Sequence, residues 1–104
     1  TTSLWLNGPL HGKAACVFTS SGSMHGGQES TLLTMLQPLF HHGMMILGLN
    51  NAIPALSHTK TGGTPYGASH VSGPRHDQRL SQDEKVLCEA QGKRLGEVVK
   101  KLHA

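Results

Sequence analysis

"Lys13-Ala-Ala-Cys-Val-Phe-Thr19" is the stretch that decides the fold. Its apolarity is continuous rather than alternating, which is typical of a strand buried on both faces, as in a parallel sheet. A second short apolar run, Met44-Met-Ile-Leu-Gly-Leu49, predicts a second buried strand. A glycine- and serine-rich loop follows the first run, so the chain has room for a helix between the two strands.

The residues between the two strands show the pattern of that helix. Apolar side chains recur at helical spacing between Leu32 and Phe40, Gln28 and Glu29 lie in the first turn, and Gly43 is placed to cap the end. Pro38 lies inside the pattern and is expected to kink or shorten the helix. Strand, loop, helix and strand together form one parallel crossover unit.

A last helix is predicted from Ser81, because Ser81 and Glu84 have the spacing of a capping box. Gly92 and Gly96 lie within this helix. Each glycine costs about 1 kcal/mol relative to alanine, so we expect both to pack closely against the sheet. The residues from 50 to 80 are predicted to form one long loop, and loops of that length are usually functional.

The predicted elements do not complete a domain. Two parallel strands and two helices cannot cover both faces of a buried sheet, because each strand needs neighbours and each face needs a helical layer. The sequence therefore predicts the second half of a doubly wound domain whose first strands lie outside these 104 residues. The chain also begins at Thr1 without a methionine, in the manner of a segment of a longer protein.

Composition excludes several functional classes. The net charge of +3 is modest, and four of the nine basic residues fall in the last twelve positions, where they suit the carboxyl end of a helix. A dense basic face for nucleic acid is therefore not expected. No apolar stretch approaches the roughly 18 residues that span a bilayer, and no signal peptide opens the chain. These observations predict a cytoplasmic protein that does not bind membranes.

The cysteines and histidines do not have the spacing of a metal site. Cys16 and Cys88 stand far apart and are expected to be small buried hydrophobic residues in a reducing compartment. His41 and His42 are adjacent, so on a helix they point in different directions, and the other histidines lack zinc-ligand spacing. No metal is expected.

The loop between Phe18 and Ser30 lies at the carboxyl end of the first strand, where open α/β sheets bind ligands. It matches neither the P-loop nor the dinucleotide pattern, and Glu29 places a negative charge where a phosphate would sit. Backbone N–H groups and hydroxyls suit a flat, polar, largely neutral ligand better. A tight turn without any ligand explains the pattern equally well.

Five motifs in register resemble one family. They are Ser3-Leu-Trp-x-x-Gly8, Leu10-x-Gly-Lys13, Val17-Phe-Thr-Ser-Ser-Gly-Ser-Met-His-Gly-Gly-Gln-Glu29, His41-His-Gly-Met44 and Gly62-Gly-Thr-Pro-Tyr-Gly-Ala68. Over nearly its whole length the chain resembles the carboxyl-terminal half of the tryptophan-repressor-binding-protein family (WrbA). These are flavoproteins, FMN-dependent NAD(P)H:quinone oxidoreductases that form homotetramers.

The resemblance implies a fold and a site. The fold is a flavodoxin-like, three-layer αβα domain with a parallel sheet, of which residues 1–104 form the carboxyl-terminal portion while the amino-terminal phosphate-loop half is absent. Trp5 would line the substrate pocket, no residue is assigned as catalytic, and the cofactor does the chemistry. The predicted FMN contacts are Ser20, Ser21, Gly22, Ser23, Met24, His25, Gly26 and His41.

The resemblance also implies which molecules react with the flavin and why this fragment alone would be inactive. NAD(P)H would reduce the flavin, and a quinone would take two electrons from it. The loop is one residue longer than in many members, with Met24 and His25 where a small residue is common. Without the phosphate loop, this fragment alone is expected to bind FMN poorly and to be inactive. The alternative is a flavodoxin-like electron-transfer or partner-docking module without enzymatic activity, although Trp5 and the long loop would restrict access to its flavin.

Overall fold

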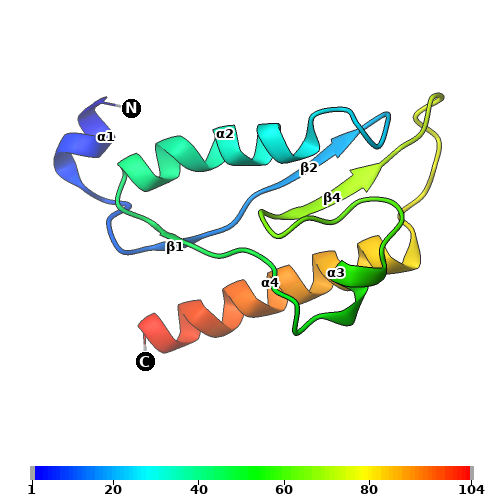
Figure 1. Cartoon of the computed structure of the whole chain (residues 1–104). Coiled ribbons are helices and arrows are strands. Elements are labelled where there is room, and N and C mark those ends of the chain that lie inside the picture. The colour runs from blue at the N-terminus through cyan, green and yellow to red at the C-terminus, as the bar shows by residue number, and fades with distance from the viewer. Residues whose placement is uncertain (1, 104) are drawn as a thin grey trace.

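Parallel strands lie between two layers of helices (Figure 1). The computed structural model describes residues 2–103, and its strands form two parallel pairs. In these pairs, β1 (Ala14–Ala15) lies beside β3 (Met45–Ile46), and β2 (Phe18–Ser21) lies beside β4 (Ala68–Val71).

Helix α2 (Gln28–His41) covers one face of the strands, and α3 (Pro54–His58) and α4 (Gln82–Leu102) lie on the other (Figure 1). Helix α1 (Thr2–Asn7) stands at one end of the molecule and has no buried residue. The expected α/β fold, part of a flavodoxin-like domain, is confirmed.

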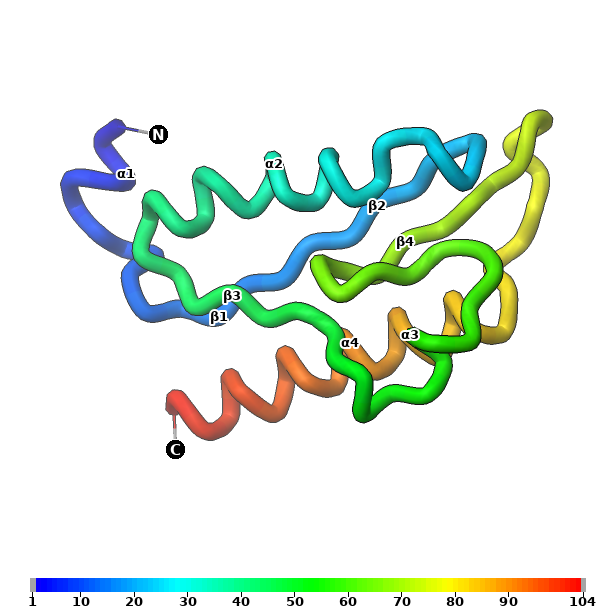
Figure 2. Tube along the Cα trace, in the orientation of Figure 1, coloured from blue at the N-terminus to red at the C-terminus, as the bar shows by residue number. Residues whose placement is uncertain are grey.

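The first predicted strand is a single extended segment that changes partners along its length, as the Cα trace shows (Figure 2). It pairs with β3 and then with β4, because the neighbouring strand is interrupted. The chain leaves the sheet after Leu47, whose N–H donates to the Ala15 carbonyl, and returns at Ala68. The prediction of one loop over residues 50–80 is therefore wrong in part, since α3 and β4 lie within it.

Helix α2 forms where the sequence predicts it. Gly43 has a φ of +75°, and the N–H groups of Gly43 and Met44 donate to the carbonyls of Phe40 and Leu39. This is the Schellman arrangement that ends a helix at glycine. Pro38 does not shorten the helix, which continues to His41.

Two small apolar clusters lie on opposite faces of the strands. Val17, Leu32 and Leu36 form the cluster beneath α2. The cluster beneath α3 and α4 is formed by Leu49, Ala55, Ala68 and Leu87. The split follows from the strand period, because neighbouring residues of one strand point to opposite faces.

The molecule exposes more surface than its size requires. Its accessible surface is 6889 Å², whereas a globular protein of this mass exposes roughly 5,700 Å². Its radius of gyration is 14.9 Å, against roughly 13 Å for a compact chain of about 100 residues. The excess surface indicates that the described residues leave part of the core uncovered.

Several predictions of burial are wrong for this reason. Phe18 is 73% exposed, so the first strand is not buried on both faces. Cys88 is exposed and Cys16 is only half-buried. A Cβ atom at Gly92 or Gly96 would meet nothing within 4 Å, so neither glycine packs against the sheet. In each case no described residue lies where the expected neighbour would be.

None of the helices in residues 2–103 is long and apolar enough to cross a membrane.

Candidate functional site

Residues 20–26, called here the loop of residues 20–26, comprise the last two residues of β2 and most of the connection to α2, and hydrogen bonds hold their base. The Ser21 hydroxyl donates to the Ser23 carbonyl over 2.7 Å. The buried Gln28 amide donates to Ser21 Oγ over 2.8 Å and to the His70 carbonyl over 3.0 Å. A Cβ atom at Gly26 would come within 2.8 Å of Ser21 Cβ, so only glycine fits there without a shift. The base of the loop is therefore fixed in shape.

The tip of the same loop is exposed and has free donors. The backbone N–H groups of Ser23, Met24 and His25 have no hydrogen-bond acceptor within residues 2–103. Gly27, the N-cap of α2, has a φ of +77° and makes no side-chain cap. The loop thus presents uncommitted N–H groups to solvent beside a helix amino terminus, an arrangement suited to ligand oxygen or nitrogen acceptors.

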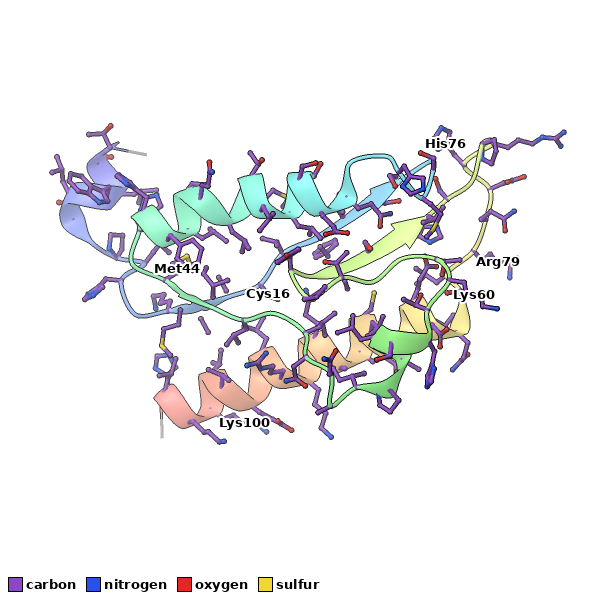
Figure 3. The ribbon with its side chains drawn as sticks, viewed as in Figure 1. Cys16, Met44, Lys60, His76, Arg79 and Lys100 are labelled. Atoms are coloured by element: carbon purple, nitrogen blue, oxygen red, sulfur yellow. The ribbon has the colours of Figure 1, made fainter. Side chains whose placement is uncertain are left out.

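A second loop, which follows β4 and includes residues 72–76, packs against one side of the loop of residues 20–26. No sequence motif predicts it as part of the site. The Ser72 N–H donates to the Ser21 carbonyl over 2.8 Å, and Ser72 Oγ lies 3.1 Å from His76 Nδ1. A Cβ atom at Gly22 would be 3.0 Å from His76 Cε1. Figure 3 shows His76 at the end of the molecule where these two loops meet.

His76 has a φ of +56°, an uncommon backbone conformation for a residue other than glycine. The only sequence signal for this loop was its position in the long stretch after Leu49.

Trp5 and His41 lie together at the opposite end of α2. Their rings stack at a centroid distance of 5.0 Å with an angle of 21° between the planes. They line a hollow of about 360 Å³ that His11, His42 and Gly43 help to form. The structure therefore brings together two of the predicted site residues, one on α1 and one on α2.

The structure does not bring these two residues to the loop of residues 20–26. The loop precedes α2 and His41 ends it, and α2 has 14 residues. A helix of that length measures about 20 Å. Within one chain the predicted site residues therefore form two groups at opposite ends of one helix (Figure 1).

The Glu84 carboxylate links three segments of the chain near the loop of residues 20–26. The capping box with Ser81 is confirmed: Ser81 N–H donates to Glu84 Oε1 over 2.7 Å, and Glu84 N–H donates to Ser81 Oγ. The same carboxylate also accepts the N–H groups of Gly62 and Val71 over 2.9 and 2.8 Å, and it contacts His70 Nδ1 at 3.0 Å. Its side chain is 1% exposed.

The pKa of Glu84 reflects this environment. Burial alone would raise the pKa, but the hydrogen bonds from Ser81, His70, Val71 and Gly62 outweigh it and lower the pKa to about 2. Glu84 is therefore a carboxylate that stabilises the fold around the loops. It is not suited to donate a proton near neutral pH.

Gln91 fills the interruption between the two strand pairs. Its Oε1 accepts the Ala68 N–H over 2.7 Å, and its Nε2 donates to the Val17 carbonyl over 2.9 Å. The side-chain amide thus replaces the peptide group that a continuous neighbouring strand would supply. The sequence signal was available, since Gln91 follows Leu87 by four residues and shares its buried helix face.

No group of three or more potential metal ligands lies close together within residues 2–103. Burial raises the pKa of the Cys88 thiol, and the charges of Glu84 and Glu89 raise it further. Cys88 is therefore less reactive at neutral pH than an ordinary thiol.

Comparison with known proteins gives the geometry a context. No family model matches the chain. Over 98% of its length, the chain is 44% identical to a protein of Syntrophobacter fumaroxidans, 42% to one of Geotalea daltonii and 40% to one of Chromohalobacter salexigens. Each of the three is named NAD(P)H dehydrogenase (quinone).

The chain resembles half of a quinone dehydrogenase. It spans about half the length of the curated relatives that it matches, 51–52% in these three. The resemblance to a quinone oxidoreductase family that the five motifs predict is thereby confirmed. The roles of the individual site residues stay predictions.

Proposed function

We propose that this chain forms half of an FMN-dependent NAD(P)H:quinone oxidoreductase. The observation that carries the proposal is the 40–44% identity, over 98% of the chain, to proteins named NAD(P)H dehydrogenase (quinone). The fold supports it, because the loop of residues 20–26 lies at the carboxyl end of β2, where parallel α/β sheets bind cofactors. The cytoplasmic location expected from the sequence stays a prediction.

The residues of the loop fit one side of a flavin site. The exposed N–H groups of Ser23, Met24 and His25 can donate to the carbonyl oxygens and ring nitrogens of a flavin, and the Ser20 and Ser23 hydroxyls can bond to a ribityl chain. Gly22 and Gly26 leave room for close approach. The chemistry supplied by bound FMN is acceptance of a hydride from NAD(P)H and two-electron reduction of a quinone.

The chain's own residues would bind and orient the flavin and the substrate. The fixed base of the loop, held by Gln28 and Ser21, would present the N–H groups of the tip in one geometry. Trp5, which stacks on His41, would provide a flat surface for an aromatic substrate, and His41 would lie beside the flavin. The hollow that they line has a volume of about 360 Å³. No residue of the chain is assigned a proton-transfer role.

The separation of the two groups supports a homo-oligomer, the homotetramer that the resemblance implies. A three-ring flavin held by the loop of residues 20–26 cannot reach the Trp5–His41 pair of the same chain across about 20 Å of helix. If both groups serve one flavin, the pair must come from another copy. The exposed pair and the exposed loop are both free to make that contact.

The test is a chimera in which this chain replaces the matching half of the Syntrophobacter fumaroxidans relative. We expect it to retain FMN, to lose flavin absorption when NAD(P)H is added, and to recover it when benzoquinone is added. Trp5→Ala should weaken quinone turnover without removing the flavin, and Trp5→Phe should restore most of it because the stacking surface is kept.

A chimera that neither retains nor accepts FMN would contradict the proposal. A chimera that binds FMN but turns over no quinone with NAD(P)H as sole donor would favour the electron-carrier alternative. Lys100→Ala, an exposed change far from both groups, serves as the control and should leave turnover unchanged.

A further inference from the structure

The peptide bond between Asn7 and Gly8 joins the end of α1 to the turn that follows it. Both residues are exposed, and α1 has no buried residue. Gly8 has a φ of +67°, and a Cβ atom at this position would meet nothing within 4 Å. The bond therefore lies in an open part of the surface, within reach of water.

An asparagine that is followed by glycine can modify itself. The backbone nitrogen of Gly8 attacks the side-chain carbon Cγ of Asn7, because glycine has no Cβ atom to hinder the approach. A five-membered succinimide forms as the Cγ–Nδ2 bond breaks, and the amide proton of Gly8 leaves with that nitrogen as ammonia. Water then opens the ring at either carbonyl and gives aspartate or isoaspartate. The net reaction consumes water, releases ammonia and needs no oxidant, reductant or cofactor.

The folded form of α1 prevents this attack. The Gly8 N–H donates to the Leu4 carbonyl over 2.9 Å, so the attacking nitrogen is held in a hydrogen bond at the end of the helix. Side chains of a helix point back toward its amino terminus, which turns the Asn7 amide away from the Gly8 nitrogen. The reaction therefore requires the last turn of α1 to open.

The stack of Trp5 on His41 attaches α1 to the end of α2. The two ring centroids are 5.0 Å apart, and Asn7 lines the same hollow as both rings. A short helix without buried residues lies at the low end of local stability, so we expect it to open often. A stacked aromatic pair shifts such an opening equilibrium by about two- to tenfold.

We propose that Asn7 and Gly8 form a self-modification site whose rate is set by the attachment of α1 through Trp5. The reaction replaces a neutral amide by a carboxylate in the hollow that the side chains of His11, His41 and His42 also line. The modification thereby places a negative charge beside three imidazoles. The reaction itself needs no flavin and does not rest on the proposed function.

The experiment incubates the 104-residue chain, and separately a peptide of residues 3–12, in mildly alkaline buffer. Aspartate and isoaspartate at position 7 are then measured by proteolysis and mass spectrometry. We expect conversion in both, slower in the chain by about tenfold because α1 must open first. Asn51 is the internal control, since it is exposed but followed by alanine. It should convert about tenfold more slowly than Asn7 in the chain, because the alanine Cβ hinders the attack.

Three variants test the role of the Trp5 ring. Trp5→Ala removes the stack and should speed conversion at Asn7 by about two- to tenfold, toward the rate in the peptide. Trp5→Phe keeps an aromatic ring on His41 and should stay close to the rate of the native sequence. Leu6→Ala, a change on the same helix at a side chain that is 69% exposed, is the matched control and should not speed the reaction.

Three results would overturn the proposal. The first is an unmodified Asn7 in the chain under conditions in which the peptide converts. The second is conversion at Asn51 as fast as at Asn7, because the glycine would then not determine the site. The third is an Asn7 rate that Trp5→Ala leaves unchanged, because the attachment of α1 would then not limit the reaction. A chimera without quinone turnover would remove only the proposed function.

Discussion

The two edges of the sheet differ in how their backbone groups are satisfied. At the β4 edge, Glu84 accepts three N–H groups from three segments, and Gly62 lies against the Ser69 carbonyl. At the β2 edge, alternate backbone groups face outward and Phe18 is 73% exposed. The comparison shows that the described residues satisfy the outward-facing backbone groups at the β4 edge and leave those at the β2 edge unpaired. The stability of the chain should therefore depend on the polar groups of the β4 edge and of the strand interruption.

The largest effect is expected from Glu84→Ala. The change leaves the N–H groups of Gly62, Val71 and Ser81 without their acceptor, and each buried unsatisfied group costs about 1–3 kcal/mol. We expect the free energy of unfolding to fall by about 4 kcal/mol in urea titrations followed by circular dichroism. Glu89→Ala, an exposed change on the same helix, should alter it by less than about 0.5 kcal/mol. If both substitutions lowered the free energy of unfolding equally, the stability of the β4 edge would not depend on the Glu84 carboxylate.

Lowering the pH should destabilise the β4 edge of the sheet. The pKa of Glu84 is about 2 in the folded chain and 4.5 ordinarily, so its carboxylate contributes stability above pH 4.5 that is lost as the pH falls toward 2. The shift corresponds to about 3 kcal/mol. The free energy of unfolding, measured between pH 6 and pH 2, should show this loss in the native sequence. A Glu84→Gln variant that kept the same pH dependence would show that other groups cause it.

A smaller loss is expected from Gln91→Leu, which keeps the volume but removes both hydrogen bonds across the strand interruption. The Ala68 N–H and the Val17 carbonyl would be left buried and unpaired. We expect a loss of about 2 kcal/mol in the same titrations. Gln37→Leu, at an exposed position of α2, is the matched control and should have little effect. A neutral Gln91→Leu would mean that water can replace the side-chain amide.

The smallest expected effect is a gain in the free energy of unfolding, from substitutions on the face of α4 that no described residue covers. A Cβ atom at Gly92 meets nothing within 4 Å, and alanine favours a helix over glycine by about 1 kcal/mol. Gly92→Ala should therefore raise the free energy of unfolding of the chain alone by about 0.5–1 kcal/mol. Gly96→Ala should act in the same direction. A loss of stability at both positions would show that this helix face is covered in the chain alone.

The sequence predicts the elements whose signals are local. Apolar spacing and Gly43 define α2, and the Ser81–Glu84 pair defines the start of α4. Strand β4 is missed because Ala68-Ser-His-Val71 has neither an apolar run nor an alternating pattern, and its pairing with β2 depends on contacts distant in the sequence. The burial expected for Phe18 fails because the periodicity of a strand does not say which neighbours are present.

In the candidate site, too, local motifs predict some residues, whereas contacts between distant segments are not predicted. The five motifs predict Trp5, His41 and the loop of residues 20–26 as site residues, and the structure brings Trp5 and His41 together. Their separation from the loop by the length of α2 cannot be read from motifs. The supporting contacts of Gln28 and Ser72 could not be read either, because each joins segments far apart in the sequence.

The position of Trp5 has a spectroscopic consequence. It is the only tryptophan of the chain, and it lies on a helix that has no buried residue. Its fluorescence therefore reports the stacking contact with His41 rather than the melting of the strands. Because short elements with few buried contacts open before the rest of a fold, the emission should change at a lower urea concentration than the far-ultraviolet signal. In this molecule one built-in fluorophore monitors the attachment of α1 and leaves the core to be followed by other probes.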